Sequence, residues 1–251
     1  LTDGHQNVLI GEEAGENLVG GGYNVAIGSD SLKAATAAIY TIAIGKNAMS
    51  SGLVTANQAI GIGYGALASA TSSDETVAIG GYSGDAITTA NYNTFVGYNS
   101  ASQLTTSPNN TAVGHGAMLG HATQDTTSTN NVAIGMGAMY VASGSNSNTA
   151  VGVGALSGSS AGMQGDSNVA IGLLAMANAT NPYDNVAIGN YAGYDMTTGF
   201  NHTLVGYYAG GNLTDADSNT AIGKNALYSA VTSDDTVAIG FDALYSQTVD
   251  G

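Results

Sequence analysis

A five-residue motif, in which a mostly polar position is followed by three mostly apolar positions and a glycine, returns fourteen times along the chain. One copy reads Asn185-Val186-Ala187-Ile188-Gly189, and most successive motif glycines are 17 residues apart, with three longer intervals of 18, 21 and 20 residues. A short period over the whole length is typical of a repeat protein whose neighbouring units pack on one another. The motif glycines are Gly11, Gly28, Gly45, Gly63, Gly80, Gly97, Gly114, Gly135, Gly152, Gly172, Gly189, Gly206, Gly223 and Gly240.

Each motif predicts a short β-strand, whose positions we count from the glycine as zero. Position −1 is always Ile or Val, and position −3 is always β-branched. Side chains two residues apart point to the same side of a strand, so these positions predict an apolar face that we expect to form the core. Position −2 points the other way and is alanine in ten repeats. So small a residue indicates close packing, for instance of another chain, or a tolerated solvent face.

The residues after each glycine predict a corner. Position +3 is Ala or Ser in every repeat, and position +4 is Leu, Met, Gly or Ala. Glycine readily adopts the backbone angles of a tight turn. We therefore expect the chain to turn at the glycine and to re-enter the core at +3 and +4.

Two polar columns accompany the apolar ones. Asparagine occupies position −4 in nine repeats, and threonine occupies position +8 in eight. Stacked coils would set the amides above one another in a hydrogen-bonded ladder, and we expect both columns to satisfy turn backbone. The residues are Asn7, Asn24, Asn93, Asn110, Asn131, Asn148, Asn168, Asn185 and Asn219, and Thr36, Thr71, Thr88, Thr105, Thr180, Thr197, Thr214 and Thr248.

These patterns predict an all-β fold, a parallel β-solenoid. A 17-residue coil with two short strands cannot bury its apolar face alone, whereas stacked coils form a continuous core. We expect one domain over residues 1–251, with about 14 coils, that belongs to a longer fibre. Extra residues fall between Ala48 and Ile62, in 119–130 and in 157–167, and the two longer segments should bulge outward as loops.

The charge of the chain excludes one class of partner. Three lysines, no arginine and 18 acidic residues give a formal net charge of −15, which repels a nucleic-acid backbone. The absence of cysteine excludes disulfides and thiolate metal sites. No apolar run has the length of a membrane helix, so we expect no membrane insertion, and residues 1–5 do not resemble a signal peptide.

Motifs that could carry chemistry are weak. The segment Gly61-Ile-Gly63-Tyr-Gly-Ala66 matches a dinucleotide-binding fingerprint, but its second glycine belongs to the repeat, and we expect no cofactor. Acidic pairs such as Asp74-Glu75, Asp215-Ala-Asp217 and Asp234-Asp235 lack the regular spacing of calcium-binding rolls, which favours solvated turns over a metal site. No catalytic residue is predicted. The histidines share no column and are expected at the surface: His5, His115, His121 and His202.

Aromatic residues near the corner after the glycine are the best candidates for binding. Such rings stack on sugars, and their hydroxyl groups reach polar partners. Alternatively, they cover the small glycine and alanine residues beside them. The candidates for glycan or receptor contact are Tyr64, Tyr82, Tyr98, Tyr191, Tyr207, Tyr208 and Phe241.

The pattern Asn-x-Ala-[Ile/Val]-Gly-x-x-[Ala/Ser], as in 131–138 and 219–226, resembles the YadA-like head repeat of trimeric autotransporter adhesins. It is also similar to arrays in phage tail-fibre proteins that are often followed by Ala-Leu-Tyr, as in 226–228 and 243–245. The resemblance covers essentially the whole chain and implies a left-handed β-roll that trimerises side by side and attaches to a surface. The 17-residue coil is longer than that of the adhesin head, so the cross-sections need not match.

Four functions are therefore considered. The leading one is an extracellular structural and adhesive fibre, on a virion tail or cell surface, that forms a homotrimer and contacts a host glycan or receptor through many weak sites. The second is a filament subunit that assembles end to end without a receptor. An ice-binding solenoid is suggested by the threonine column, although paired Thr-x-Thr ranks are absent from the sequence. An enzyme has the least support.

Overall fold

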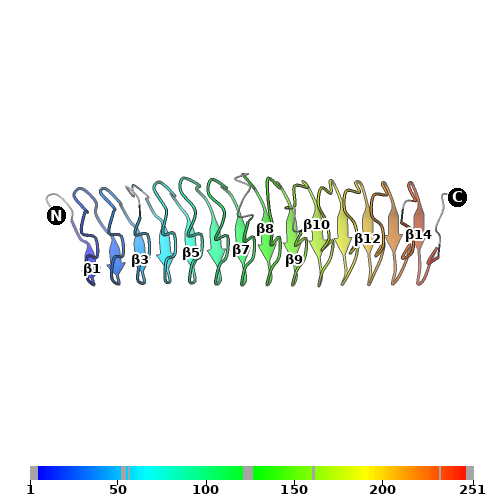
Figure 1. Ribbon diagram of the computed structural model, residues 1–251, viewed down its shortest axis with the longest axis horizontal. Coiled ribbons are helices and arrows are strands. Elements are labelled where there is room, and N and C mark those ends of the chain that lie inside the picture. The colour runs from blue at the N-terminus through cyan, green and yellow to red at the C-terminus, as the bar shows by residue number, and fades with distance from the viewer. Residues whose placement is uncertain are drawn as a thin grey trace. The chain divides into compact units, whose positions relative to one another are not determined.

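The structure is a computed structural model that describes residues 5–51, 55, 57–120, 127–159, 162–231 and 233–246. The chain divides into two compact units, Leu1–Thr127 and Ser128–Gly251. Each unit is a stack of similar coils, and each coil carries one short strand (Figure 1). The described residues contain no helix.

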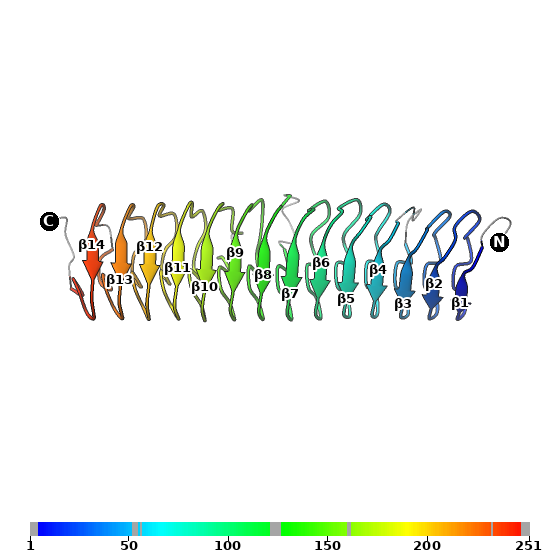
Figure 2. The ribbon, with the colours of Figure 1, turned by 180° about the vertical axis from the view of Figure 1, so that it is seen from behind.

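The strands of each unit are three residues long and lie side by side in sequence order, as both views show (Figure 2). All pairs are parallel, and each motif position pairs with the same position of the next coil, for example Ala170 with Ala187. The strands of the first unit are β1 (Val8–Ile10), β2 (Val25–Ile27), β3 (Ile42–Ile44), β4 (Ile60–Ile62), β5 (Val77–Ile79), β6 (Thr94–Val96) and β7 (Thr111–Val113). Those of the second are β8 (Val132–Ile134), β9 (Thr149–Val151), β10 (Val169–Ile171), β11 (Val186–Ile188), β12 (Thr203–Val205), β13 (Thr220–Ile222) and β14 (Val237–Ile239).

The parallel β-solenoid is confirmed, but the expectation of two strands per coil is wrong for the described residues. Beyond the motif strand, neighbouring coils meet in isolated β-bridges such as Ile39 with Asn57 and Tyr183 with Phe200. The reason is a residue at position −5 that has φ between 51° and 62° in every coil, for example Tyr23 and Asn201. This left-handed conformation interrupts extended backbone before a second strand can lengthen.

The predicted orientation of the strand is reversed. The middle residue of β2 to β14, at position −2, is buried, whereas positions −1 and −3 are exposed or half-buried in all the described strands. In β11 the exposed fraction is 0% for Ala187 and 38% for Ile188. Alanine therefore faces the core of its own coil, and the Ile and Val columns face outward.

The core of each coil is narrow, and it is filled by large residues that face small ones across the coil. In most coils with alanine at position −2, position +4 is a buried Leu or Met, as in Leu32 and Met176. In the four coils with glycine at +4, position +7 is instead a large buried residue, such as Met196 or Leu213. Leu204 lies within 3.0 Å of the place where a side chain would begin on Gly193 or Gly210, and Phe95 lies 2.9 Å from that place on Gly84. Alanine at −2 is thus the inner partner of a longer side chain, and the predicted re-entry of the chain at +3 and +4 is confirmed.

The segment 157–167 departs from the expected outward loop. Met163 is fully buried and forms a β-bridge with Ala142, so this part of the insertion returns to the core. Residues 121–126 of the insertion in 119–130, and residues 52–54 and 56 near the single extra residue, lie outside the described residues.

The asparagine ladder is confirmed and has a regular geometry. Nδ2 of Asn24 donates to the carbonyl oxygen of Ala38 in the next coil at 2.6 Å, while Oδ1 accepts the N–H of Thr41 at 2.9 Å. In the stretch from Asn131 to Asn185 the side chains also bond to one another, with Nδ2 of Asn185 3.0 Å from Oδ1 of Asn168. Most of these asparagines therefore tie their coil to the next at two backbone groups, whereas Nδ2 of Asn93 has no hydrogen-bond partner.

The threonine column also links coils. The Thr71 hydroxyl donates to the carbonyl oxygen of Thr88 at 3.0 Å, and the Thr180 hydroxyl donates to that of Thr197 at 3.1 Å. These hydroxyl groups serve the backbone, as the sequence predicted. Thr248 lies outside the described residues.

Candidate binding surfaces

The outward side of the motif strands is an apolar surface in each unit. Positions −3 and −1 carry only Val, Ile and Thr, and none of the fourteen strands in the described residues contains a charged residue. Ile79 is 39% exposed and Ile134 is 40% exposed. On a chain of charge −15, an uncharged face that recurs in every coil is typical of an interaction surface. We call it the strand face.

Aromatic side chains of the first unit form a row at the corner after the glycine. Ring centres of Tyr64 and Tyr82 are 5.1 Å apart, those of Tyr82 and Tyr98 are 6.1 Å apart, and His115 stacks on Tyr98 at 5.7 Å. The structure thus brings together three predicted residues and adds a histidine. His115 sits in the same column as Tyr64 and Tyr98, directly after its glycine.

A larger aromatic cluster lies in the second unit. Tyr208 stacks on Tyr191 with ring centres 4.6 Å apart and meets Tyr207 edge-on at 4.7 Å. On the other side, Tyr228 lies 5.5 Å from Tyr208 and stacks on Tyr245 at 5.1 Å. Burial against the neighbouring rings raises the pKa of the Tyr208 hydroxyl, which therefore stays protonated as a hydrogen-bond donor.

Sequence reasoning missed three members of this cluster, Tyr194, Tyr228 and Tyr245. All three stand at position +5, so the coil repeat places them beside the predicted residues. The recurrence of Ala-Leu-Tyr at 226–228 and 243–245 was the signal that could have identified two of them.

The aromatic residues cover small residues, which is one of the two roles considered for them. Tyr82 and Tyr98 lie over Gly65 and Gly81, where an added Cβ would be 3.3 Å and 3.2 Å from the rings. The same rings stay partly open to solvent, since Tyr98 is 51% exposed. They cover glycine backbone and still present a face to an external partner.

Lys224 joins the aromatic surface of the second unit. Its ammonium nitrogen lies 5.8 Å from the centre of the Tyr207 ring and 5.6 Å from the centre of the Phe241 ring. These distances fit a cation–π interaction with each ring.

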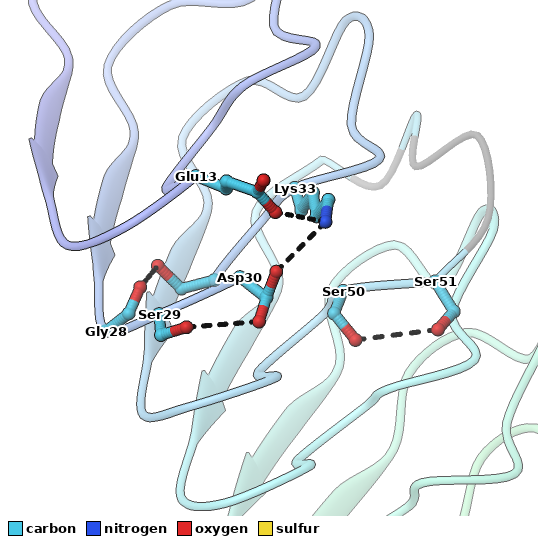
Figure 3. A network of polar contacts seen from close by, with 8 residues as sticks. Glu13, Gly28, Ser29, Asp30, Lys33, Ser50 and Ser51 are labelled. Carbon is cyan, nitrogen blue, oxygen red and sulfur yellow. Dashed lines mark hydrogen bonds and ion pairs between the residues drawn. The ribbon is translucent and has the colours of Figure 1, made fainter.

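A separate polar hollow lies in the first unit around Lys33 (Figure 3). Lys33 contacts the carboxylates of Glu13 and Asp30, and the Ser29 hydroxyl donates to Asp30 at 3.1 Å. The hydrogen bond from Lys33 lowers the pKa of Asp30, and the carboxylates raise that of Lys33. The hollow has a volume of about 420 Å³ and is also lined by Asn47, Ser50 and Ser51. The two carboxylates outnumber the single ammonium group, so the cluster keeps a net charge of −1. Exposed ion pairs of this kind contribute little stability.

Acidic turn residues serve a second ladder that sequence reasoning missed. The Asp217 carboxylate accepts the N–H of Phe200 at 3.1 Å, and the Asp234 carboxylate accepts the N–H of Asp217 at 2.8 Å. The Asp74 carboxylate accepts the N–H of Asn57 in the same way at 2.7 Å. All these residues occupy position −6, so reading that column would have shown the pattern. Within the described residues no three His, Cys, Asp or Glu side chains gather as a metal site would require.

The prediction of surface histidines is wrong for His202. This residue is 1% exposed and occupies the position of asparagine in the ladder. Its Nδ1 accepts the N–H of Asn219 at 3.1 Å, and Nε2 faces the carbonyl oxygen of Ala216. The imidazole fits because position −7 in its coil is glycine, Gly199. His5 is exposed, and His121 lies outside the described residues.

The segment resembling a dinucleotide fingerprint is part of the repeat. Gly61 and Gly63 belong to the motif of β4, and Gly61 faces the core against Met49. The next residues form the same turn as in other coils, without the helix that the fingerprint needs.

Comparison with models of protein families, with curated proteins and with solved structures found no match. No helix among the described residues meets the length and hydrophobicity needed to cross a bilayer.

Proposed function

We propose that the chain is a structural and adhesive fibre protein, an extracellular homotrimer of β-solenoids on a phage tail fibre or cell surface. The observation that carries this proposal is the strand face. Two outward columns of Val, Ile and Thr recur through every described coil without a charge. Solvent-exposed apolar surfaces of this kind stabilise association when they are buried against a partner.

Side-by-side packing of identical chains suits this surface. Three copies related by a three-fold axis would present the same coil at the same height, so each outward isoleucine would meet its equivalents. The interface of the trimer is then formed by positions −1 and −3. These positions replace the alanine column, for which the sequence analysis considered packing against another chain, because those alanines are buried inside their own coil.

Surface attachment is assigned to the aromatic residues. Rings such as Tyr207, which is 46% exposed, offer flat faces and hydroxyl groups suited to sugars. Individual contacts with glycans are weak, and three chains with several rings each would increase avidity.

The assembly state tests the structural part of the proposal. Light scattering on the purified chain should give the mass of three chains, and electron microscopy should show discrete particles. A monomer would contradict the proposal, whereas open-ended polymers would favour a filament subunit.

Adhesion is tested separately with Tyr207→Ala. This change should reduce binding to immobilised glycans or host cells without altering the mass or the unfolding temperature. If the variant unfolds instead, the ring is a structural residue and the assigned attachment role is wrong.

A further inference from the structure

Three consecutive coils of the second unit form a site around a lysine. Tyr207, Lys224 and Phe241 each follow a motif glycine directly, so the coil repeat places them in one row. The ammonium group lies between the two rings, at 5.8 Å and 5.6 Å from their centres. We call these three residues the lysine clamp.

The positive charge of the clamp is not neutralised within the described residues. Both ion pairs found there are made by Lys33. Asp242 follows Phe241 in the chain, but its carboxylate accepts a hydrogen bond from Nδ2 of Asn225 at 2.9 Å. Aromatic faces attract an ammonium group without occupying its hydrogen-bonding capacity. Lys224 can therefore donate to an external anion.

The rings beside Lys224 supply flat apolar surface. Phe241 is 70% exposed and Tyr207 is 46% exposed. The hydrocarbon face of a pyranose ring can stack on such a surface while its polar groups stay hydrated. A ligand that uses the whole clamp thus combines a sugar ring with a negative group.

We propose that the lysine clamp binds a sugar carrying a single negative charge, as a carboxylate or a sulfate ester. The sugar stacks on Phe241 or Tyr207, and its anionic group accepts a charge-assisted hydrogen bond from Lys224. One charge suits the site better than several, because the chain as a whole carries a formal charge of −15 and repels polyanions. The inference rests on the proposed attachment function and narrows its ligand.

The decisive experiment compares closely related disaccharides with and without a negative charge. Saturation-transfer NMR titrations of the full chain would use cellobiouronic acid, its methyl ester and cellobiose 6-sulfate. We expect the acid to bind about tenfold more tightly than the ester, in line with one charge-assisted hydrogen bond. Added salt should weaken binding of the acid and leave the ester unchanged. The sulfate distinguishes general recognition of an anion from recognition of a carboxylate.

Matched variants show which residues cause the preference for the acid over the ester. Lys224→Gln should remove the preference for the acid, and Phe241→Ala should weaken both the acid and the ester. Lys46→Gln is the control, because Lys46 stands at the same position of a coil in the first unit but has no pair of flanking rings.

Several outcomes would overturn the inference, and they bear differently on the proposed function. Equal binding of the acid and the ester would exclude charge recognition while leaving glycan attachment intact. Absence of binding to every saccharide, with a trimeric mass, would contradict adhesion as well. If Lys224→Gln lowers the mass instead of the affinity, the lysine serves assembly.

Discussion

The motif glycine is the residue with the strictest requirement in each coil. Its φ lies between 128° and 138°, a region that other residues rarely adopt. Space is equally limiting, because a Cβ on Gly189 would be 2.4 Å from the carbonyl oxygen of Gly206 in the next coil. Backbone conformation and coil stacking therefore both demand glycine.

A matched pair of variants separates these two demands. Gly240 has a similar φ, but an added Cβ there would have only Ala243 nearby, at 3.9 Å. We expect Gly240→Ala to cost about 1–3 kcal/mol from backbone strain. Gly189→Ala should cost about 1–3 kcal/mol more because of overpacking. Urea unfolding measures both, and equal losses would show that the close approach of the coils is unimportant.

His202 is the titratable residue in the asparagine ladder. Nδ1 must stay unprotonated to accept the N–H of Asn219. Burial lowers the pKa of His202, although the carboxylates of Asp217 and Asp234 oppose this shift. The unfolded chain, in contrast, takes up a proton as the pH falls through about 6.5.

The free energy of unfolding should therefore depend on pH through this residue. The contribution of neutral His202 is fully present above about pH 6.5 and declines as the pH falls towards the lower pKa of the folded state. In His202→Asn the amide should restore the ladder, so that this part of the acid sensitivity disappears while stability at neutral pH is kept. Unfolding of both proteins between pH 7 and pH 5 measures the difference. An unchanged acid dependence would assign the effect to the carboxylates.

Within a coil, the short strand and the turn after it act as one packing unit. Position −2 of the strand fills the core from one side, and positions +4 and +7 of the turn fill it from the other, so the sizes of these three residues are linked. Ala221 is paired with Leu227, whereas Leu204 is accompanied by Gly193 and Gly210. Leu227 has φ of 56° and Gly210 has φ of 59°, so the backbone at +4 is the same with either residue.

This link predicts a rescue. Leu204→Ala should leave a cavity and lower the free energy of unfolding by about 2–5 kcal/mol. Adding Gly210→Leu and Leu213→Ala reproduces the arrangement of Ala221, Leu227 and Ala230 in the next coil and should recover much of that loss. Thermal unfolding of the single and triple variants is the measurement. If the triple variant is no more stable than Leu204→Ala, these positions do not share a cavity.

At the scale of the whole molecule, the proposed assembly depends on the strand face. Ile188 is directed outward from β11, so a carboxylate there does not enter the core of the coil. We expect Ile188→Asp to convert the proposed trimer into monomers, because association would bury three unpaired charges near the axis.

Val231→Asp provides the control for that change. Val231 is also β-branched and is 44% exposed, but it lies outside the motif strands. Light scattering should show an unchanged mass for Val231→Asp, and circular dichroism should show that both variants keep their fold. If Ile188→Asp still has the mass of a trimer, the strand face is not the interface.

The sequence by itself determined the repeat, the parallel solenoid and the ladder of Asn24, Asn185 and their equivalents. These features depend on contacts between identical positions of successive coils, and a constant period brings identical positions together. The aromatic row was predictable in part for the same reason, because Tyr64 and Tyr98 share position +1, whereas Tyr82 of the coil between them stands at position +2.

Only the tertiary structure decided which side of each strand is inside. Alternation shows that Ala187 and Ile188 face opposite ways, but the choice depends on what lies across the coil. In this coil the buried Met196 of the turn fills the narrow core from the other side, so the small alanine points inward and the isoleucine points outward. Burial of His202 likewise depended on the space that Gly199 leaves beside it. Such pairings join residues at different positions of the repeat, and a column of identical positions does not contain that information.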